Sequence, residues 1–173
     1  MPAAIRQASR GDAVALAAFA AQAFAETYRE LSDAQEIADY VAEHFQPAVM
    51  AGVIADPACT TLLAHVGGEL AGYAIVRAEA PPGCVPAPAV QLWRLYLGRA
   101  FTGRGLGAQL MQAVHAEACR RGAGTLWLGV YDRNVRAVRF YERAGFAKVG
   151  HQEFLFGGEV YMDPVYAVAV SAG

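Results

Sequence analysis

The sequence lacks the features that would mark a membrane protein. Its 173 residues contain no apolar run near the roughly 18 residues that a membrane span needs. Its first residues, MPAAIRQASRGD, do not place a charged stretch before an apolar one, as a targeting signal would. We therefore expect a cytoplasmic protein without a membrane partner. With 55% hydrophobic and 17% charged residues, the chain is also not of the disordered type, and we expect one domain spanning residues 1–173.

Cysteine and histidine are too scattered for a metal cage. The three cysteines are far apart and form no C-x-x-C pair, so the pattern indicates neither a disulfide framework nor a zinc site. The four histidines are equally separated, and no metal is expected. These residues are Cys59, Cys84, Cys119, His44, His65, His115 and His151.

Lysine is almost absent, and the positive charge is unevenly placed. Lys148 is the single lysine, whereas residues 94–143 contain nine arginines against three acidic residues. Residues 26–43 carry six acidic residues against Arg29 alone, within a chain of net charge −2. This asymmetry favours an anionic ligand for the basic half and a cationic ligand for the acidic segment. Nucleic acid is not an expected partner, because no recognition motif accompanies the arginines.

The hydrophobic periodicity predicts a mixed α/β chain in the order β-α-α-β-β-β-α-β-α-β-β. A strand, a glycine-rich turn, a helix and a strand follow one another, which forms a βαβ crossover and makes part of the sheet parallel. Strands are predicted at 3–9, 60–66, 70–79, 89–98 and 125–131 and on both sides of Gly157 and Gly158, and helices at 11–28, 32–45, 105–121 and 134–144, with a short helical stretch ending near Ala55.

The stretch RAFTGRGLGAQLM, residues 99–111, places three glycines within five residues and then continues as an apolar helical pattern. A glycine turn that opens a helix favours phosphate binding, because free N–H groups and the positive end of the helix dipole face outward together. The spacing G-R-G-L-G does not match the G-x-G-x-x-G of a dinucleotide-binding fold, and no Lys-Ser or Lys-Thr follows, which excludes a P-loop.

A second pattern follows one βαβ unit later, in NVRAVRFYERAGF, residues 134–146. Its helical spacing places Tyr141 on the inward face and lines Arg136, Arg139 and Arg143 along another. An inward tyrosine is usually only part of a core. Its combination with a glycine-rich phosphate turn makes a functional role the better interpretation.

In this order and spacing, the two stretches resemble the acetyl-CoA-binding motifs of the GCN5-related N-acetyltransferase (GNAT) superfamily. The signature Q/R-x-x-G-x-G/A is matched by residues 102–107 except at Thr102. The motif N-x-x-A-x-x-F-Y-x-x-x-G-F is matched at Asn134, Ala137, Phe140, Tyr141, Gly145 and Phe146. The resemblance runs from about residue 3 to 170 and is greatest to the bacterial spermidine/spermine acetyltransferase branch, in WLGVYDRN, HQEFLFGGEVYMD and AETYRE.

The resemblance implies a GNAT fold, of α/β (α+β) class. Its central mixed, mostly antiparallel sheet has about seven strands, flanked by about four helices, with strands 4 and 5 parallel and splayed. It also implies an acetyl-CoA-dependent N-acetyltransferase that transfers acetyl to the primary amine of a small molecule, with a polyamine as one candidate, by direct attack in a ternary complex. A monomer or a homodimer is expected.

The resemblance carries over site residues by motif position. Tyr141 would protonate the departing thiolate. The backbone of strand 4 would pair with the pantetheine arm, and an N–H near Leu97 would face the thioester oxygen. The implied cofactor-binding residues are Leu95, Tyr96, Leu97, Thr102, Gly103, Arg104, Gly105, Leu106, Gly107, Ala108, Asn134, Ala137, Tyr141 and Arg143.

The general base and the acceptor stay open. Polyamine-acetylating relatives often carry a glutamate on the fourth strand, but residues 90–95 read VQLWRL, without a carboxylate. Glu26, Glu30 or a water held by Gln91 could serve instead, and Tyr28, Tyr40 and Trp93 offer aromatic walls for a cationic acceptor. The expected acceptor-binding residues are Glu26, Tyr28, Glu30, Gln91 and Trp93. Two alternatives are a non-catalytic acetyl-CoA sensor and an acetyltransferase for peptide or protein N-terminal amines.

Overall fold

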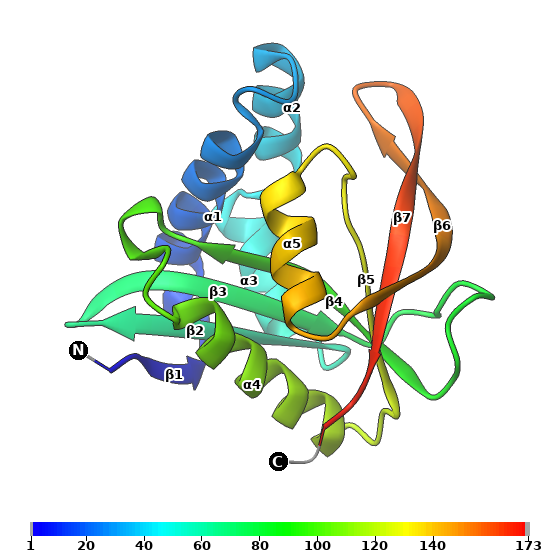
Figure 1. Cartoon of the computed structure of the whole chain (residues 1–173). Helices are drawn as coiled ribbons and strands as arrows, with labels where there is room; N and C mark the ends of the chain where they lie inside the picture. Colours follow the sequence, from blue (N-terminus) through cyan, green and yellow to red (C-terminus); the bar gives the residue numbers. More distant parts are fainter. Residues whose placement is uncertain (1, 172–173) are drawn as a thin grey trace. The chain divides into compact units, whose positions relative to one another are not determined.

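The computed structural model describes residues 2–171 and contains seven strands and five α-helices within that range (Figure 1). The strands are β1 (Ala4–Gln7), β2 (Cys59–Val66), β3 (Glu69–Arg77), β4 (Ala89–Leu97), β5 (Thr125–Gly129), β6 (Ala147–Phe156) and β7 (Glu159–Ala169). The helices are α1 (Ala13–Tyr28), α2 (Ala34–His44), α3 (Pro47–Ala55), α4 (Leu106–Arg120) and α5 (Val135–Arg143).

The sheet is mixed, as the sequence predicts. Hydrogen bonds join the strands in the order β1-β2-β3-β4-β5-β7-β6, with β4 and β5 parallel. The pairs β1–β2, β5–β7 and β6–β7 are antiparallel. The predicted fold class is therefore confirmed, and α3 is the short helical stretch that the sequence places before residue 55.

The contacts of the chain divide it into two compact units. Unit 1 consists of Met1–Ile75 and Arg94–Leu110, and unit 2 consists of Val76–Trp93 and Met111–Gly173. The prediction of one domain over the whole chain stays a prediction.

In unit 1, α1 packs against α2 and α3, and α3 packs against β2 (Figure 1). Leu16, Ala20 and Phe24 form the buried stripe of α1, spaced by four residues, as an amphipathic helix requires. Asp33 caps α2, because its Oδ1 accepts a hydrogen bond of 2.9 Å from the Gln35 N–H. Helix α2 therefore begins at Ala34, directly after its cap, within the predicted range of 32–45.

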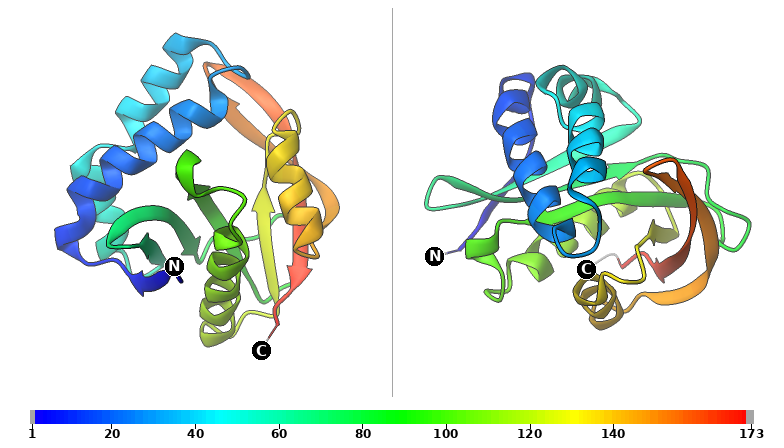
Figure 2. Two further views of the ribbon diagram at one scale, coloured as in Figure 1. Left: turned by 60° about the vertical axis from the view of Figure 1, so that its left-hand side comes forward. Right: turned by 90° about the horizontal axis from the view of Figure 1, so that it is seen from above.

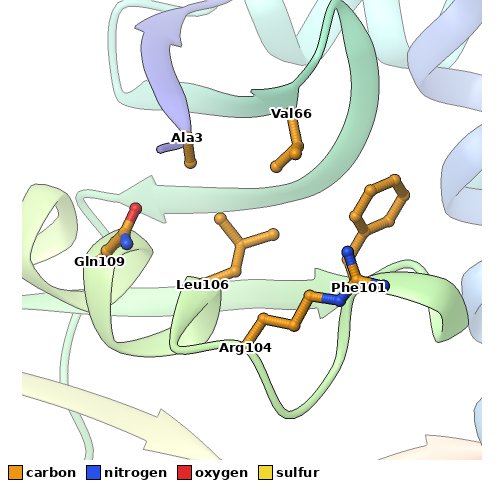
Figure 3. A pocket seen from close by; sticks show the side chains of 6 residues that line it. All are labelled: Ala3, Val66, Phe101, Arg104, Leu106 and Gln109. Carbon is orange, nitrogen blue, oxygen red and sulfur yellow. The ribbon is translucent and has the colours of Figure 1, made fainter. Parts of the chain in front are cut away.

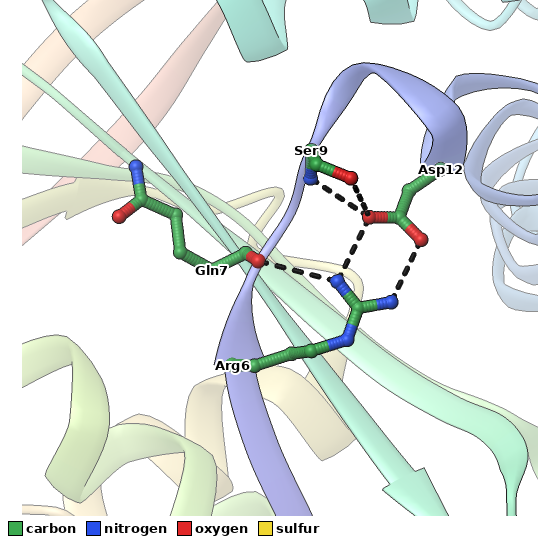
Figure 4. Close-up of polar contacts among 4 residues, drawn as sticks. All are labelled: Arg6, Gln7, Ser9 and Asp12. Atoms are coloured by element: carbon green, nitrogen blue, oxygen red, sulfur yellow. Dashed lines mark hydrogen bonds and ion pairs between the residues drawn. The ribbon is translucent and has the colours of Figure 1, made fainter.

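The first strand is shorter than the predicted range of 3–9 because the chain turns at Ser9. Arg6 makes two hydrogen bonds to the Asp12 carboxylate, of 2.8 and 2.7 Å, and the Ser9 N–H donates to Asp12 Oδ2 at 2.7 Å (Figure 4). These bonds hold a short 3-10 turn, Arg10–Asp12, directly before α1. The arginine and the Ser9 N–H lower the pKa of Asp12 well below its ordinary value.

In unit 2, β6 and β7 form a hairpin around Gly157 and Gly158, and β7 also pairs with β5. Helix α5 runs beside β5 and β7 in both Figure 1 and the left view of Figure 2. Trp127 packs with Val85 and Val165 in a buried apolar cluster. β5 ends at Gly129, two residues before the predicted end.

Candidate active site

The glycine turn of unit 1 presents open backbone. Gly103 and Gly105 have φ angles of +76° and +78°, which residues with a Cβ rarely adopt. A Cβ built on either glycine would meet no atom within 4 Å apart from its chain neighbours, so no other part of the protein crowds these two positions. The Thr102 hydroxyl donates to the Arg99 carbonyl at 3.0 Å and closes the turn. The turn therefore approaches a ligand without steric hindrance.

Helix α4 begins directly after this turn, at Leu106. Its first intrahelical hydrogen bond runs from the Gln109 N–H to the Gly105 carbonyl at 3.2 Å, so the preceding N–H groups have no acceptor within the helix. Leu106 and Gly107 are buried and anchor the helix start, whereas Ala108 is exposed. Free N–H groups at a positive helix end fit the oxygens of a diphosphate.

Arg104 lies within the same turn and is exposed. Its guanidinium carbon lies 5.9 Å from the centre of the Phe101 ring. Figure 3 shows it beside a pocket of unit 1, with Leu106 between the arginine and Gln109. The lining residues of this pocket are Ala3, Val66, Phe101, Arg104, Leu106 and Gln109. Arg104 therefore places an exposed positive charge within the glycine turn.

Strand β4 is longer than its pairing with β5. The parallel register covers Ala89 to Gln91, whereas β4 itself continues to Leu97. The end of β4 is held on its other side: the Gly98 N–H donates to the Ala71 carbonyl at 2.8 Å, and a Cβ on Gly72 would lie 2.7 Å from the Leu97 side chain. Leu95, Tyr96 and Leu97, the predicted partners of the pantetheine arm, lie in the part of β4 beyond this register.

Helix α5 of unit 2 carries the second motif. The Asn134 Oδ1 accepts from the Ala137 N–H at 3.3 Å and caps the helix, and Gly145, at φ +94°, ends it. Tyr141 is 9% exposed and meets the rings of Phe140 and Phe146 edge to face, at 5.3 and 5.6 Å between centres. The local motif is thus formed as predicted. The catalytic role of Tyr141 stays a prediction.

The predicted arginine stripe of α5 is exposed. Arg136, Arg139 and Arg143 all lie at the surface of the helix. This exposure agrees both with a phosphate-binding role and with a solvated helix face.

Gln91 and Trp93 are engaged by Arg77 within unit 2. The Arg77 Nε–H donates to Gln91 Oε1 at 2.6 Å, and its guanidinium carbon lies 3.9 Å from the centre of the Trp93 ring. The Gln91 oxygen therefore already accepts a hydrogen bond from a cation. This contact weakens the interpretation of Gln91 as the holder of a catalytic water.

The other predicted acceptor residues lie on and after α1. Glu26 accepts from Gln22 Nε2 at 3.0 Å, and Glu30 is exposed. Tyr28 stacks at a tilt on Phe24, with ring centres 4.6 Å apart. Of these three residues, Glu30 is exposed, whereas Glu26 and Tyr28 are half-buried.

Two buried groups were missed by sequence reasoning. Arg94 of β4 is 6% exposed, and its Nη2 donates to the Tyr40 hydroxyl at 3.1 Å. Asp163 of β7 is 7% exposed, and burial together with the Asp132 charge raises its pKa to about 6. A charged residue inside the apolar run QLWRLYL was a signal that could have identified Arg94. Asp163 gave no such signal, because it lies next to a proline near the end of the chain.

Within residues 2–171, no group of three histidine, cysteine or acidic side chains is placed to hold a metal ion. No helix in the same part of the chain has the length and apolarity that crossing a membrane requires.

The sequence and the fold are both similar to those of known acetyltransferases. The sequence model described as "Acetyltransferase (GNAT) family" matches residues 18–146. An uncharacterized N-acetyltransferase of Mycobacterium bovis is 35% identical over 147 residues, which cover 84% of this chain and 90% of that protein. The crystal structure of the PaiA N-acetyltransferase from Thermoplasma acidophilum in complex with coenzyme A has a TM-score of 0.81 at 20% identity, covering 98% and 99% of the two chains.

A spermine/spermidine N(1)-acetyltransferase of Bacillus subtilis is 31% identical over 78 residues, which are 42% of this chain and 47% of that protein. This similarity covers less than half of either chain, so the predicted placement in the polyamine branch stays a prediction.

Proposed function

Because the chain belongs to the acetyltransferase (GNAT) family, it is an acetyl-CoA-dependent N-acetyltransferase, and we propose that its acceptor is the primary amine of a small molecule. The observation that supports acetyl-CoA binding is the glycine turn before α4, where Gly103 and Gly105 leave open backbone at a helix start. Diphosphate oxygens would accept hydrogen bonds from the N–H groups of residues 102–108. Arg104, beside the turn, would add positive charge.

Acetyl-CoA supplies an activated acetyl thioester when it is bound. The backbone of Leu95 and Leu97, in the part of β4 beyond its register with β5, would pair with the amides of the pantetheine arm. The Tyr141 hydroxyl would donate its proton to the thiolate that departs. The base that accepts the proton of the attacking amine stays open between Glu26, Glu30 and a water molecule.

The acceptor is attracted as a cation. Six acidic residues on α1, α2 and the segment between them, against Arg29, create a negative surface in unit 1: Glu26, Glu30, Asp33, Glu36, Asp39 and Glu43. A polyamine is one acceptor with a positive charge, and the partial similarity to the Bacillus subtilis enzyme supports it. The ammonium group of an amino acid is another.

Two measurements test this function. Calorimetry with coenzyme A measures binding, and thiol release from acetyl-CoA in the presence of polyamines, amino acids and peptides measures transfer. We expect binding in the micromolar range and thiol release with at least one acceptor class. Absence of coenzyme A binding would overturn the proposal. Binding without thiol release would favour the sensor alternative.

A matched pair of glycine variants locates the diphosphate. Gly105→Ala and Gly68→Ala introduce the same backbone strain, because their φ angles are +78° and +82° and neither new Cβ meets an atom within 4 Å. Gly68 lies in the turn between β2 and β3, away from the glycine turn in sequence. We expect both to cost similar stability, about 1 kcal/mol, and only Gly105→Ala to weaken coenzyme A binding, about tenfold. Equal affinities in the two variants would contradict the assignment.

A further inference from the structure

Unit 1 holds a positive charge among aromatic rings. The Arg94 guanidinium carbon lies 4.7 Å from the centre of the Phe45 ring and 5.6 Å from that of Tyr40. Its Nη2 donates to the Tyr40 hydroxyl at 3.1 Å. Burial and this positive charge lower the pKa of His44, whose ring centre lies 4.1 Å from that of Tyr40. The field of Arg94 is therefore strong in this part of the unit.

A second group nearby has an unused hydrogen-bond donor. Tyr73 of β3 is fully buried, and its hydroxyl has no hydrogen-bond partner among residues 2–171. Its ring stacks with Tyr96 at 5.8 Å and meets Phe19 edge to face at 6.0 Å. Burial raises the pKa of Tyr73 well above its ordinary value, so the hydroxyl keeps its proton. A buried O–H without a partner is costly, and native proteins retain few of them.

These groups form one cluster, consisting of Tyr28, Tyr40, Tyr73, Arg94 and Tyr96, which we call the Arg94 cluster. Tyr73 stacks on Tyr96, which lies two residues from Arg94 on β4, and Arg94 in turn hydrogen-bonds to Tyr40. The rings of Tyr28 and Tyr96 both lie beside Phe24, with their centres 4.6 and 6.5 Å from the centre of its ring. Tyr28, Tyr40 and Tyr96 are half-buried, whereas Tyr73 and Arg94 are buried. The cluster therefore combines a buried cation, a buried hydroxyl donor and three half-buried phenols.

The chemistry of the Arg94 cluster selects an oxyanion. An ammonium group would be repelled by the guanidinium, and an apolar group would leave the Tyr73 hydroxyl without a partner. A carboxylate accepts several hydrogen bonds and matches the planar fork of an arginine. Its charge of −1 is also equal and opposite to that of the Arg94 guanidinium, whereas a phosphate carries up to two negative charges.

We propose that the Arg94 cluster binds a carboxylate of the acetyl acceptor, through the Arg94 guanidinium and the Tyr73 hydroxyl, so that the acceptor is an amino-acid-like amine rather than a polyamine. This inference rests on the proposed function, in which the protein transfers acetyl to an amine acceptor. The six acidic residues at positions 26–43, four of which are exposed, would attract the ammonium end of the same molecule. The buried Arg94 guanidinium and the acidic residues of unit 1 thus match the carboxylate and the ammonium group of a zwitterion.

The first test measures binding without catalysis. N-acetyl amino acids, the products of the proposed transfer, are titrated by calorimetry against their carboxamides, which differ only in the charge of one group. We expect at least one N-acetyl amino acid to bind about tenfold or more tightly than its carboxamide. Equal affinities throughout the panel, or no binding of any carboxylate, would overturn the proposal. Coenzyme A binding is measured separately, so a failure here does not depend on the cofactor.

The second test is Tyr73→Phe, which removes only the unpartnered hydroxyl. Because this hydroxyl has no partner in the described part of the chain, its removal should leave the stability equal or higher. We expect KM for the preferred amino acid to rise about tenfold, with KM for acetyl-CoA unchanged and the preference over the carboxamide reduced. Tyr161→Phe is the matched control, since its hydroxyl contacts Glu159 on the exposed β6–β7 hairpin and should change none of these constants.

The kinetic outcomes separate the inference from the proposed function. Thiol release with polyamines but not with amino acids would support the proposed transferase function and overturn the proposed carboxylate site. An unchanged KM for the amino acid in Tyr73→Phe would likewise overturn the proposal, because the Arg94 cluster would then have only a structural role. Arg94→Lys, which keeps the charge and loses the planar fork, should also raise KM for the amino acid.

Discussion

Asp163 allows a quantitative test of the structure through its pH dependence. The residue lies on β7, opposite Gln152 of β6, and is 7% exposed. Burial raises the pKa of its carboxyl to about 6, and the negative charge of Asp132 adds to the effect. The folded protein therefore keeps the proton of this carboxyl up to a higher pH than the unfolded chain does. Asp163→Asn replaces it by a neutral amide of the same shape.

The sign of the effect follows from proton linkage. Below a pH of about 4 the carboxyl is protonated in both the folded and the unfolded chain, and stability is unaffected by it. Between that pH and about 6 the folded chain holds the proton and the unfolded chain has lost it, so the free energy of unfolding falls as the pH rises. A separation of about two pH units between the two states corresponds to roughly 2 to 3 kcal/mol.

Urea denaturation at a series of pH values from 4 to 8 measures this difference. We expect Asp163→Asn to match the wild-type stability near pH 4 and to exceed it by about 2 kcal/mol at pH 7.5. Asp132→Asn is the control: it removes the neighbouring charge, leaves the burial, and should give a smaller gain. A destabilised Asp163→Asn at pH 7.5, or a difference that does not vary with pH, would refute the reasoning.

Three further predictions concern Tyr141, Asp12 and the acidic residues of α1 and α2. Tyr141→Phe should lower kcat at least tenfold while the calorimetric affinity for coenzyme A stays within twofold; unchanged turnover would remove Tyr141 from the mechanism. Asp12→Asn should destabilise the protein at pH 7, because the lowered pKa of Asp12 gives stability above pH 4 that is lost as the pH falls, and the difference from wild type should shrink toward pH 2 in denaturation curves. KM for the acceptor should rise with ionic strength, as stopped-time thiol assays would measure, since the acidic residues of α1 and α2 are mostly exposed.

The features that sequence predicts well are local ones. The glycine turn and the α5 motif each lie within about 13 consecutive residues, so their spacing alone indicates a backbone cradle and a capped helix. The structure forms both. Strand and helix ends were less accurate, because they depend on particular contacts such as the Arg6–Asp12 pair, which ends β1 early.

The Arg94 cluster could not be predicted because its members come from distant parts of the sequence. Tyr40, Tyr73 and Arg94 meet only when α2, β3 and β4 have packed, and no pattern in any one of these segments specifies the meeting. The raised pKa of Asp163 has the same origin, since it depends on the register of β6 with β7. Sequence propensity indicates where helices and strands form, whereas the burial of a charged side chain depends on how these helices and strands pack in the folded unit.

The placement of charge in unit 1 also explains the absence of a carboxylate on β4. A glutamate on this strand beside Arg94 would neutralise the guanidinium, and the cluster could then no longer select an anion. The buried cation and the exposed acidic residues should consequently respond differently to salt, because ions screen surface charges far more than buried ones. High ionic strength should weaken the attraction of the acceptor's ammonium group while leaving the preference for a carboxylate over its carboxamide almost intact. A preference that disappears together with the attraction would mean that both effects arise at the protein surface and that Arg94 takes no part in choosing the acceptor.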